Sequence, residues 1–323
     1  MKPKVYATYK MPDDVERFMK QHCDIRKWEG EELIPRDVLL KEIANVDGLY
    51  SSRNSGGIVD EELLQSAPHL KAISTVSVGY NHFDVEAMKK YNVIGTHTPD
   101  VLNETVADLT FGLILSTARR IVELDRYVKK GNWKSTAAYS ETYGRDVHSS
   151  TIGIIGMGRI GEAVAKRAKF GFDMDVLYYN RNRKQEAEEK YGAEYCELES
   201  LLKRSDFVVL MTPLTPETVR IIGAKEFKLM KKTACFINVS RGQTVDEKAM
   251  IDALNNGEIY AAGLDVYETE PVEMDNPLLT MPNVVTVPHI GSATAKTEDA
   301  MAMKAAENIV AILTGKGKFD KAD

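Results

Sequence analysis

The chain has 323 residues, of which 43% are hydrophobic and 28% charged, and its formal net charge is −6. This length allows two domains of ordinary size, and the composition is that of a globular protein. The acidic balance without basic blocks argues against nucleic acid and anionic membranes as partners. Three scattered cysteines, Cys23, Cys196 and Cys235, give neither a disulfide framework nor a metal-ligand spacing. With no signal-peptide core and no apolar run of membrane length, the sequence predicts a cytoplasmic protein.

The first third of the chain alternates between short strands and helices. A polar helical stretch is predicted around residues 11–16, helices at 61–65 and 85–90, and strands at 4–9, 48–51, 71–75 and 93–95. Such alternation predicts a parallel α/β sheet.

A single long helix is predicted over residues 103–130, because almost no polar residue interrupts its apolar face between Val106 and Ser116. We expect it to be buried, partly against a second subunit. The polar, irregular segment 131–150 is long for a loop within a domain and is predicted to be functional or an interface arm.

A glycine-rich turn follows. The apolar run Ile152–Ile155 reads as a buried strand, Gly156, Gly158 and Gly161 form a G-x-G-x-x-G pattern, and residues 162–169 are rich in helix formers. In this context the first glycine permits a tight turn, the second admits a pyrophosphate and the third lets the helix pack closely. The helix N-terminus then favours an anion, so a bound dinucleotide is predicted.

The rest of the chain repeats the strand–helix pattern. Further strands are predicted at 175–179, 207–210, 234–239, 261–266 and 284–287, and a last helix at 295–313. We therefore predict an α/β protein of two doubly wound parallel-sheet domains with a cleft between them. The flavodoxin-like substrate domain comprises residues 1–98 plus 290–323 and is discontinuous, and the Rossmann-type cofactor domain comprises residues 99–289.

Three polar side chains stand just beyond predicted strand ends, where ligands gather in open α/β sheets. Arg241 offers a guanidinium that can bind a carboxylate through two hydrogen bonds. His289 can exchange a proton near neutral pH, and a carboxylate beside a histidine favours imidazolium. Glu270 supplies that carboxylate, although spacing alone leaves Glu268 as an alternative. Such a set suits reduction of a 2-keto acid; no other histidine is predicted to be catalytic.

Taken together, these motifs resemble the D-isomer-specific 2-hydroxyacid dehydrogenases over essentially the whole chain. The resemblance rests on residues 156–161, 230–242, 263–266, 270–271 and 288–293. Within the family, the chain is similar to bacterial glyoxylate/hydroxypyruvate reductases of the 2-ketogluconate reductase (gluconate 2-dehydrogenase) type. This implies a cytoplasmic homodimer with the 103–130 helix and the Trp133 loop at its interface.

The resemblance also implies residue roles. Arg241 would bind the substrate carboxylate, His289 would act as acid/base, and Glu270 rather than Glu268 would be its partner. Backbone N–H groups of Val78 and Gly79 would cradle the carboxylate, and Ser52 and Arg53 would face the substrate; Arg53 is equally well a solvated loop residue. Cofactor contacts are implied at Thr105, Gly156, Gly158, Arg159, Ile160, Gly161, Thr212, Pro213, Thr218, Val239, Ser240, Asp265 and Ser292.

The residues after the second cofactor-domain strand bear on the choice of cofactor. NAD enzymes place an acidic residue there to bind the ribose 2′-OH. This chain instead has Asn180, Arg181 and Arg183, with no carboxylate before Glu186. An acid would repel a 2′-phosphate whereas these residues would bind one, so NADP(H) is predicted to be preferred. The alternative is that the arginines only cover the adenine rim and that NAD is used as well.

Two function classes follow. The first is an NAD(P)H-dependent reductase of glyoxylate, hydroxypyruvate or 2-ketogluconate that forms the D-2-hydroxy acid, with another D-2-hydroxyacid specificity as a variant. The second is a non-catalytic dinucleotide-sensing interaction protein, because the family is similar to some transcriptional co-repressors. The absence of long flanking interaction segments favours the enzyme.

Overall fold

The computed structural model describes residues 1–52, 55–135 and 142–322, and the chain forms two compact units. Unit 1 comprises Met1–Leu102 and Ala293–Asp323, and unit 2 comprises Asn103–Ser292. The observed borders lie a few residues after those expected at 98/99 and 289/290. Each unit has its own parallel sheet, and each is described by itself below.

Unit 1 contains a five-stranded parallel sheet in the order β2-β1-β3-β4-β5, which is the flavodoxin-like order. β2 was not predicted, because its sequence Asp-Ile-Arg-Lys has no apolar run and it lies at the sheet edge. The strands are β1 (Lys4–Ala7), β2 (Asp24–Lys27), β3 (Gly48–Ser52), β4 (Ala72–Val76) and β5 (Ile94–Thr96).

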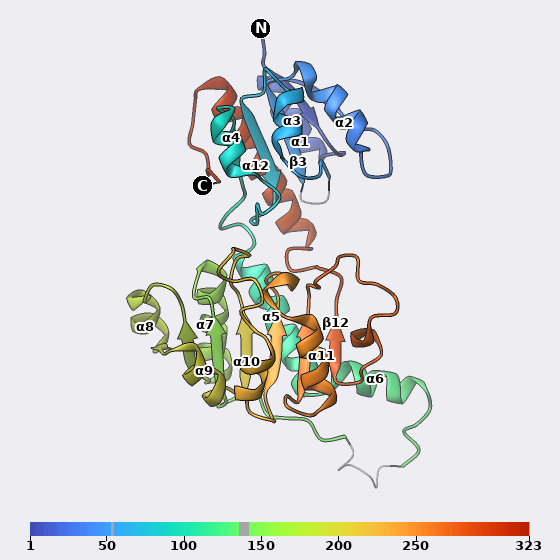
Figure 1. The fold of residues 1–323 in the computed structure, drawn as a ribbon, viewed down its shortest axis with the longest axis vertical. Coiled ribbons are helices and arrows are strands. Elements are labelled where there is room, and N and C mark those ends of the chain that lie inside the picture. Colours follow the sequence, from blue (N-terminus) through green and yellow to red (C-terminus); the bar gives the residue numbers. More distant parts are fainter. Residues whose placement is uncertain (53–54, 136–141, 323) are drawn as a thin grey trace. The chain divides into compact units, whose positions relative to one another are not determined.

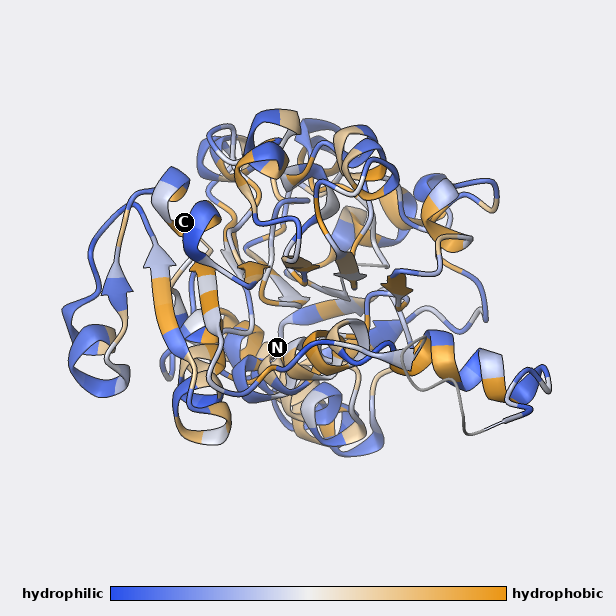
Figure 2. Cartoon of the chain, turned by 90° about the horizontal axis from the view of Figure 1, so that it is seen from below, coloured by the Kyte–Doolittle hydropathy of each residue, from blue (hydrophilic) through white to orange (hydrophobic). Residues whose placement is uncertain are grey.

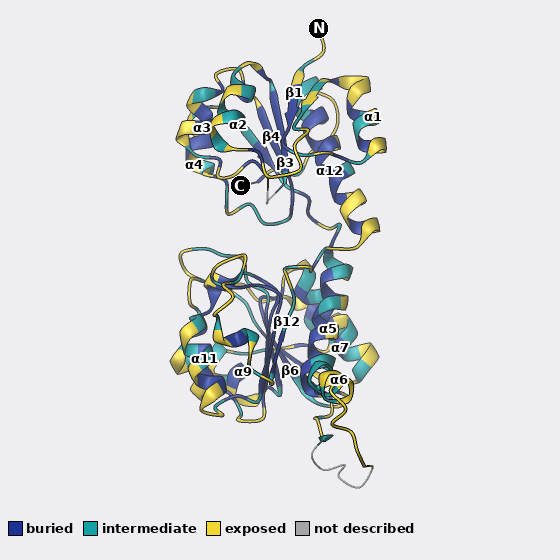
Figure 3. Cartoon of the chain, turned by 90° about the vertical axis from the view of Figure 1, so that its right-hand side faces the viewer, coloured by how far each residue is buried: buried dark blue, intermediate teal, exposed yellow. Residues whose placement is uncertain are grey.

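Helices cover both faces of this sheet, with α1 and α12 on one side and α2, α3 and α4 on the other (Figure 3). The last helix belongs to this unit because Tyr50 Oη donates to Ala302 O at 2.9 Å and Ser74 Oγ donates to Ala305 O at 2.8 Å. The helices are α1 (Asp13–His22), α2 (Arg36–Glu42), η1 (Ile43–Asn45), α3 (Glu61–Ser66), α4 (Val85–Lys90) and α12 (Ala295–Thr314).

Unit 2 contains a seven-stranded parallel sheet in the order β12-β11-β10-β9-β6-β7-β8 (Figure 1). This is the Rossmann order with one added strand, and the strand order reverses between β6 and β9. The two-residue edge strand β8 was not predicted. The strands are β6 (Thr151–Ile155), β7 (Asp175–Tyr179), β8 (Glu194–Tyr195), β9 (Phe207–Leu210), β10 (Cys235–Asn238), β11 (Ala261–Leu264) and β12 (Val284–Thr286).

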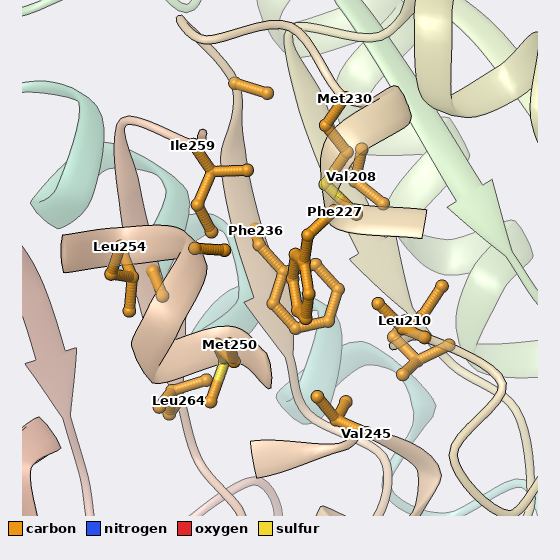
Figure 4. Close-up of a cluster of buried hydrophobic side chains, with 14 of the residues drawn as sticks. Val208, Leu210, Phe227, Met230, Phe236, Val245, Met250, Leu254, Ile259 and Leu264 are labelled. Atoms are coloured by element: carbon orange, nitrogen blue, oxygen red, sulfur yellow. The ribbon is translucent and has the colours of Figure 1, made fainter. Parts of the chain in front are cut away.

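In unit 2, α5 and α7 cover one face of the sheet, and α9 and α11 cover the other (Figure 3). On the second face, the rings of Phe227 and Phe236 meet edge to face at 5.4 Å, among Val208, Leu210 and Val245 (Figure 4). Full burial of such side chains stabilises the fold by about 1.5–3 kcal/mol each. The helices are α5 (Asn103–Ala118), α6 (Ile121–Lys129), α7 (Arg159–Phe172), α8 (Gln185–Tyr191), α9 (Leu198–Arg204), α10 (Ala224–Leu229), η3 (Gly242–Thr244), α11 (Glu247–Asn255) and η4 (Pro277–Leu279).

The long helix predicted over 103–130 is two helices, α5 and α6, and that prediction was wrong. Arg120 has a left-handed backbone (φ +54°), which ends the first helix. The Arg145 N–H caps the freed carbonyl of Ala118 at 2.8 Å. The Arg120 guanidinium is held by Glu123 at 2.6 Å, and these contacts offset the cost of a left-handed non-glycine residue.

The helices carry hydrophobic and hydrophilic residues on different sides (Figure 2). α6 also carries hydrophobic residues, but none of its residues is buried (Figure 3). Ile121 and Val128 are each 50% exposed, and Trp133 beyond the helix is 59% exposed. No helix in the described ranges combines the length and the apolar composition needed to cross a membrane.

Candidate active site

The glycine turn joins β6 to α7 at the point where the strand order reverses. Gly156 has φ +106°, and a Cβ there would lie 2.8 Å from the Met211 carbonyl carbon. A Cβ on Gly161 would lie 2.4 Å from Gly156 O, so the helix packs directly on the turn. Gly158 faces open space, with no atom within 4 Å of its Cβ position. The turn thus leaves room for a ligand beside the N-terminus of a 14-residue helix that begins at Arg159.

The segment after β9 borders this turn. Thr218 Oγ1 donates to Pro213 O at 2.6 Å and accepts from Thr215 N at 2.8 Å, which gives the loop a fixed shape. The hydroxyl of Thr212 is buried and has no hydrogen-bond partner among the residues that the structure describes. An orphaned buried hydroxyl is costly unless a ligand pairs with it. Together with the space at Gly158, it fits a phosphate-bearing dinucleotide.

The segment after β7 is tied to α8. Tyr178 Oη donates to Glu188 Oε1 at 2.6 Å and accepts from Lys184 N at 2.7 Å. Glu188 in turn binds Arg183 through Nε at 2.7 Å and Nη2 at 2.9 Å. Asn180 Nδ2 donates to the carbonyl of Asn182 at 2.8 Å. Arg183 is therefore engaged with a carboxylate, whereas Arg181 is exposed. A hydrogen bond with Thr215 lowers the pKa of Glu217, and the positive charge of Arg181 lowers it further.

Arg241 follows β10, and a buried asparagine organises its turn. Asn238, 2% exposed, accepts from Ser240 N at 3.0 Å and Ser240 Oγ at 2.9 Å, and donates to Arg241 O at 3.1 Å. The Arg241 guanidinium donates to Ser240 O at 2.6 Å. Asn238 was not singled out from the sequence, although a polar residue ending an apolar strand is a usable signal.

The buried carboxylate of Asp265, directly after β11, binds the backbone of the segment that follows β12. Asp265 is 1% exposed and accepts from the N–H groups of Ile290 at 2.6 Å and Gly291 at 2.9 Å. Burial raises its pKa from 3.8 to about 6, although both backbone hydrogen bonds lower it. The carboxylate thereby orients the backbone on either side of Ile290, next to His289.

His289 and Glu270 form a hydrogen-bonded pair. Nδ1 of His289 lies 2.8 Å from Oε2 and 3.0 Å from Oε1 of Glu270. Since an ionised carboxylate only accepts, Nδ1 carries a proton and donates it to Glu270. Nε2 is the other ring nitrogen, and it carries a proton only when the ring is an imidazolium. Glu270 is fixed by Tyr267 N at 3.2 Å, and His289 has the left-handed φ of +52°. Such backbone strain is typical of functional residues.

Glu268, the alternative partner, contacts Arg220 instead, with Nη2 to Oε1 at 2.9 Å. Arg241, Glu270 and His289 therefore follow the carboxyl ends of three neighbouring strands, β10, β11 and β12, within unit 2. Thr105 lies in the first turn of α5 and Ser292 at the end of this unit. Within the described ranges, no group of three or more His, Cys, Asp and Glu side chains is arranged to hold a metal ion.

Three of the predicted substrate residues, Ser52, Val78 and Gly79, lie in unit 1, whereas Arg241 and His289 lie in unit 2. Val78 and Gly79 follow β4, where Ser77 Oγ donates to Gly79 O at 2.6 Å and His97 Nδ1 lies 2.9 Å from Val78 O. A carbonyl only accepts, so His97 holds this loop with an Nδ1 proton, a contact that the sequence did not reveal. Ser52 N donates to Ser55 Oγ at 3.1 Å, and Arg53 lies outside the described residues.

The chain matches the family described as D-isomer specific 2-hydroxyacid dehydrogenase, NAD binding domain, over residues 111–291. It is 49% identical over 317 residues to the glyoxylate/hydroxypyruvate reductase B of Enterobacter sp. (strain 638), covering 98% of this chain and 96% of that protein. The chain belongs to the D-isomer-specific 2-hydroxyacid dehydrogenase family.

Solved structures of similar proteins support the same family assignment. A protein from Thermus thermophilus has a TM-score of 0.90 and 39% identity, covering 99% of this chain and 100% of its own. An NADPH-dependent glyoxylate/hydroxypyruvate reductase of Sinorhizobium meliloti, in complex with NADP and malonate, has a TM-score of 0.85 and 29% identity, covering 100% and 97%. The predicted family, the α/β fold class of two doubly wound sheets, and the oxidoreductase class are confirmed.

Proposed function

We propose that the protein reduces a small 2-keto acid, glyoxylate or hydroxypyruvate, to the D-2-hydroxy acid with NADPH. The observation that carries this proposal is the hydrogen bond between His289 Nδ1 and Glu270. It fixes the orientation of the ring, and we assign the Nε2 proton of the imidazolium as the one transferred to the substrate. The reductase names of relatives at 47–49% identity support the substrate class.

The residues divide the chemistry between them. The nicotinamide, when bound, supplies hydride to the carbonyl carbon of the keto acid. His289 Nε2 gives its proton to the carbonyl oxygen, and Glu270 stabilises the imidazolium before transfer. Arg241 binds the carboxylate and orients the keto oxygen. We assign the N–H groups of Val78 and Gly79 to the substrate carboxylate and Ser52 and Arg53 to its tail.

The cofactor residues in this proposal surround the glycine turn. The space at Gly158 and the buried Thr212 hydroxyl support it. The backbone at Arg159 and Ile160 would face the pyrophosphate, and Asp265 the nicotinamide carboxamide. We assign further contacts to Thr105, Gly156, Gly161, Pro213, Thr218, Val239, Ser240 and Ser292.

Preference for NADPH over NADH is supported by the segment after β7. Asn180, Arg181 and Arg183 stand where an NAD enzyme has an acid, and the Sinorhizobium relative is described as NADPH-dependent and bound to NADP. The test compares kcat/KM for the two cofactors with a saturating keto acid. An NADH preference of about tenfold, or ~1.4 kcal/mol, would contradict it.

One substrate panel separates this function from the alternatives. Purified protein is mixed with NADPH and glyoxylate, hydroxypyruvate or 2-ketogluconate, and the loss of NADPH absorbance is followed. We expect turnover of the two smaller acids. Turnover of 2-ketogluconate alone would indicate the sugar-acid specificity, and no turnover of any keto acid, with NADPH still bound, would favour a dinucleotide-sensing interaction protein.

We also propose a cytoplasmic homodimer that uses neither nucleic acid nor membrane as a partner. Exposed Ile121, Val128 and Trp133 on and beside α6 support an interface there, because a contiguous exposed apolar patch commonly marks contact with another protein and Ile121 and Val128, seven positions apart, lie on one face of the helix. The three free cysteines fit a reducing compartment. Light scattering after gel filtration should give twice the chain mass, and Val128→Glu should weaken the dimer.

A further inference from the structure

Three loops of unit 2 that are far apart in sequence meet beside the candidate active site. They follow β9, β10 and β11, which are neighbours in the sheet. The second loop carries Arg241 and the third carries Glu270. The relative position of these two loops therefore decides the spacing between the proposed carboxylate binder and the proposed proton-transfer pair.

The backbones of the second and third loops touch. A Cβ on Gly242 would lie 1.8 Å from Tyr267 O and 2.4 Å from Glu268 N, so only glycine fits. This approach brings the residue after Arg241 against the backbone that leads to Glu270. A van der Waals contact alone does not prevent one loop from sliding along the other. A directional contact, such as a hydrogen bond, is needed to set their register.

A ring of hydrogen bonds supplies that directional contact. Gln243 Nε2 donates to Glu268 O at 2.7 Å, and Gln243 O accepts from Arg220 N at 2.9 Å. Arg220 closes the ring through Nη2 to Glu268 Oε1 at 2.9 Å. From the other side, Glu268 N donates to Glu247 Oε2 at 3.0 Å.

The ring is solvent-exposed, with Arg220 57% and Glu268 38% exposed as side chains. Exposed ion pairs of this kind contribute little to folding stability. Arg220 nevertheless has a left-handed φ of +49°, which costs free energy. An ion pair that contributed nothing else would not offset this cost. The ring is therefore better explained by where it holds the loops than by how much it stabilises the fold.

We propose that Gln243 is a positioning residue that holds the Arg241 loop in register with the segment that carries Glu270, and that Arg220 and Glu268 complete this clamp. The inference rests on the proposed roles of Arg241 and Glu270. A misplacement of about 1 Å between substrate-orienting and reacting groups can cost about 10²-fold in rate.

The first test replaces Gln243 with methionine, which keeps the length of the side chain and removes its N–H. We expect kcat/KM for the keto acid to fall about tenfold, mainly through KM, while the Kd for NADPH and the Tm stay unchanged. Gln21→Met, at an exposed site on α1, is the matched control and should equal the parent. A Gln243→Met variant with parental kcat/KM would overturn the proposal.

The second test uses pH. Gln243→Glu places an ionised carboxylate against the Glu268 carbonyl at neutral pH, and protonation restores a donor. We expect the kcat/KM of this variant, divided by that of the parent, to rise as the pH falls towards the ordinary range of a glutamate pKa. A ratio that does not change with pH would count against the clamp.

The third test uses Arg220. Arg220→Ala should lower kcat/KM, Arg220→Lys should restore most of it, and Arg220→Ala combined with Gln243→Met should cost less than the sum of the single changes. Additive losses would show that the two residues act independently and would contradict the proposal that they form one clamp.

Failure of the proposed function is distinguishable, because it would show in the parent as no turnover of any keto acid. In that case the clamp is tested by measuring amide hydrogen exchange in the peptide that spans residues 266–271. Faster exchange in Gln243→Met than in the parent and Gln21→Met supports the clamp, and unchanged exchange overturns it.

Discussion

Glu270 approaches Nδ1 of His289 with both carboxylate oxygens, at 2.8 and 3.0 Å, which fixes the ring tautomer and the direction of Nε2. His289→Ala removes the proposed proton donor, so kcat should fall about 10²–10⁴-fold while NADPH still binds. Steady-state kinetics and NADPH fluorescence titration measure the two effects. His148→Ala, at an exposed histidine before β6, is the control. A parental kcat in His289→Ala would remove the acid/base assignment.

Asp265 makes the stability of the fold depend on pH. Its pKa is raised from 3.8 to about 6 by burial, so between these values the folded state binds more protons than the unfolded state. The free energy of unfolding must therefore fall as the pH rises through this window. Asp265→Asn removes that loss, which amounts to about 3 kcal/mol.

Urea unfolding at pH values from about 4 to about 7 measures this difference. The free energy of unfolding of Asp265→Asn, minus the free energy of unfolding of the parent, should rise with pH between about 4 and about 6. A constant offset reflecting the lost acceptor for Ile290 or Gly291 is expected in addition and does not affect the slope. A difference that is flat in pH would contradict the raised pKa.

We expect Glu188 to tune the predicted preference for NADPH. Its carboxylate binds Arg183 at 2.7 Å and so neutralises one of the cations after β7. Glu188→Gln should leave Arg183 able to interact with a 2′-phosphate and raise the ratio of kcat/KM for NADPH to that for NADH severalfold. Arg181→Ala should lower the same ratio. Glu186→Gln, on the same helix and paired with Lys190, is the control; an equal effect from it would point to net charge alone.

His97 supports the Val78–Gly79 loop of unit 1. Its Nδ1 lies 2.9 Å from Val78 O, and its ring packs edge to face on Tyr80 at 5.1 Å. His97→Phe keeps the ring contact and loses the hydrogen bond. We expect the KM for the keto acid to rise severalfold with kcat and the Kd for NADPH little changed, whereas His69→Phe at an exposed position should have no effect. An unchanged KM would show that the loop holds its shape without His97.

The sequence predicted those elements that carry a strong local signal. The apolar runs of β6, β9 and β10 and the glycine turn were found because buried parallel strands and phosphate-binding turns have distinctive compositions. The edge strand β2 was missed because its residues are polar, and the break at Arg120 because neither glycine nor proline marks it.

The candidate site was predictable in its chemistry and not in its supports. Arg241, Glu270 and His289 stand beyond strand ends that can be read from the sequence. The contact of Gln243 with Glu268 depends on how loops separated in sequence pack against one another, and no local pattern encodes that. Asn238 bonds its near neighbours Ser240 and Arg241, so its position at the end of an apolar strand could have pointed to it. The pairing of Glu268 with Arg220 similarly required the folded loops, which bring together residues 48 positions apart.

The last helix has a consequence for the order of folding. α12 supplies acceptors for Tyr50 and Ser74 in the sheet of unit 1, and Asn308 on it donates to His97 O at 2.8 Å. Unit 2 is continuous and is complete once Ser292 has been synthesised. Unit 1 begins first on the ribosome but lacks α12 until residues 295–314 emerge. We therefore expect one face of its sheet to be covered only by α1 while unit 2 already folds.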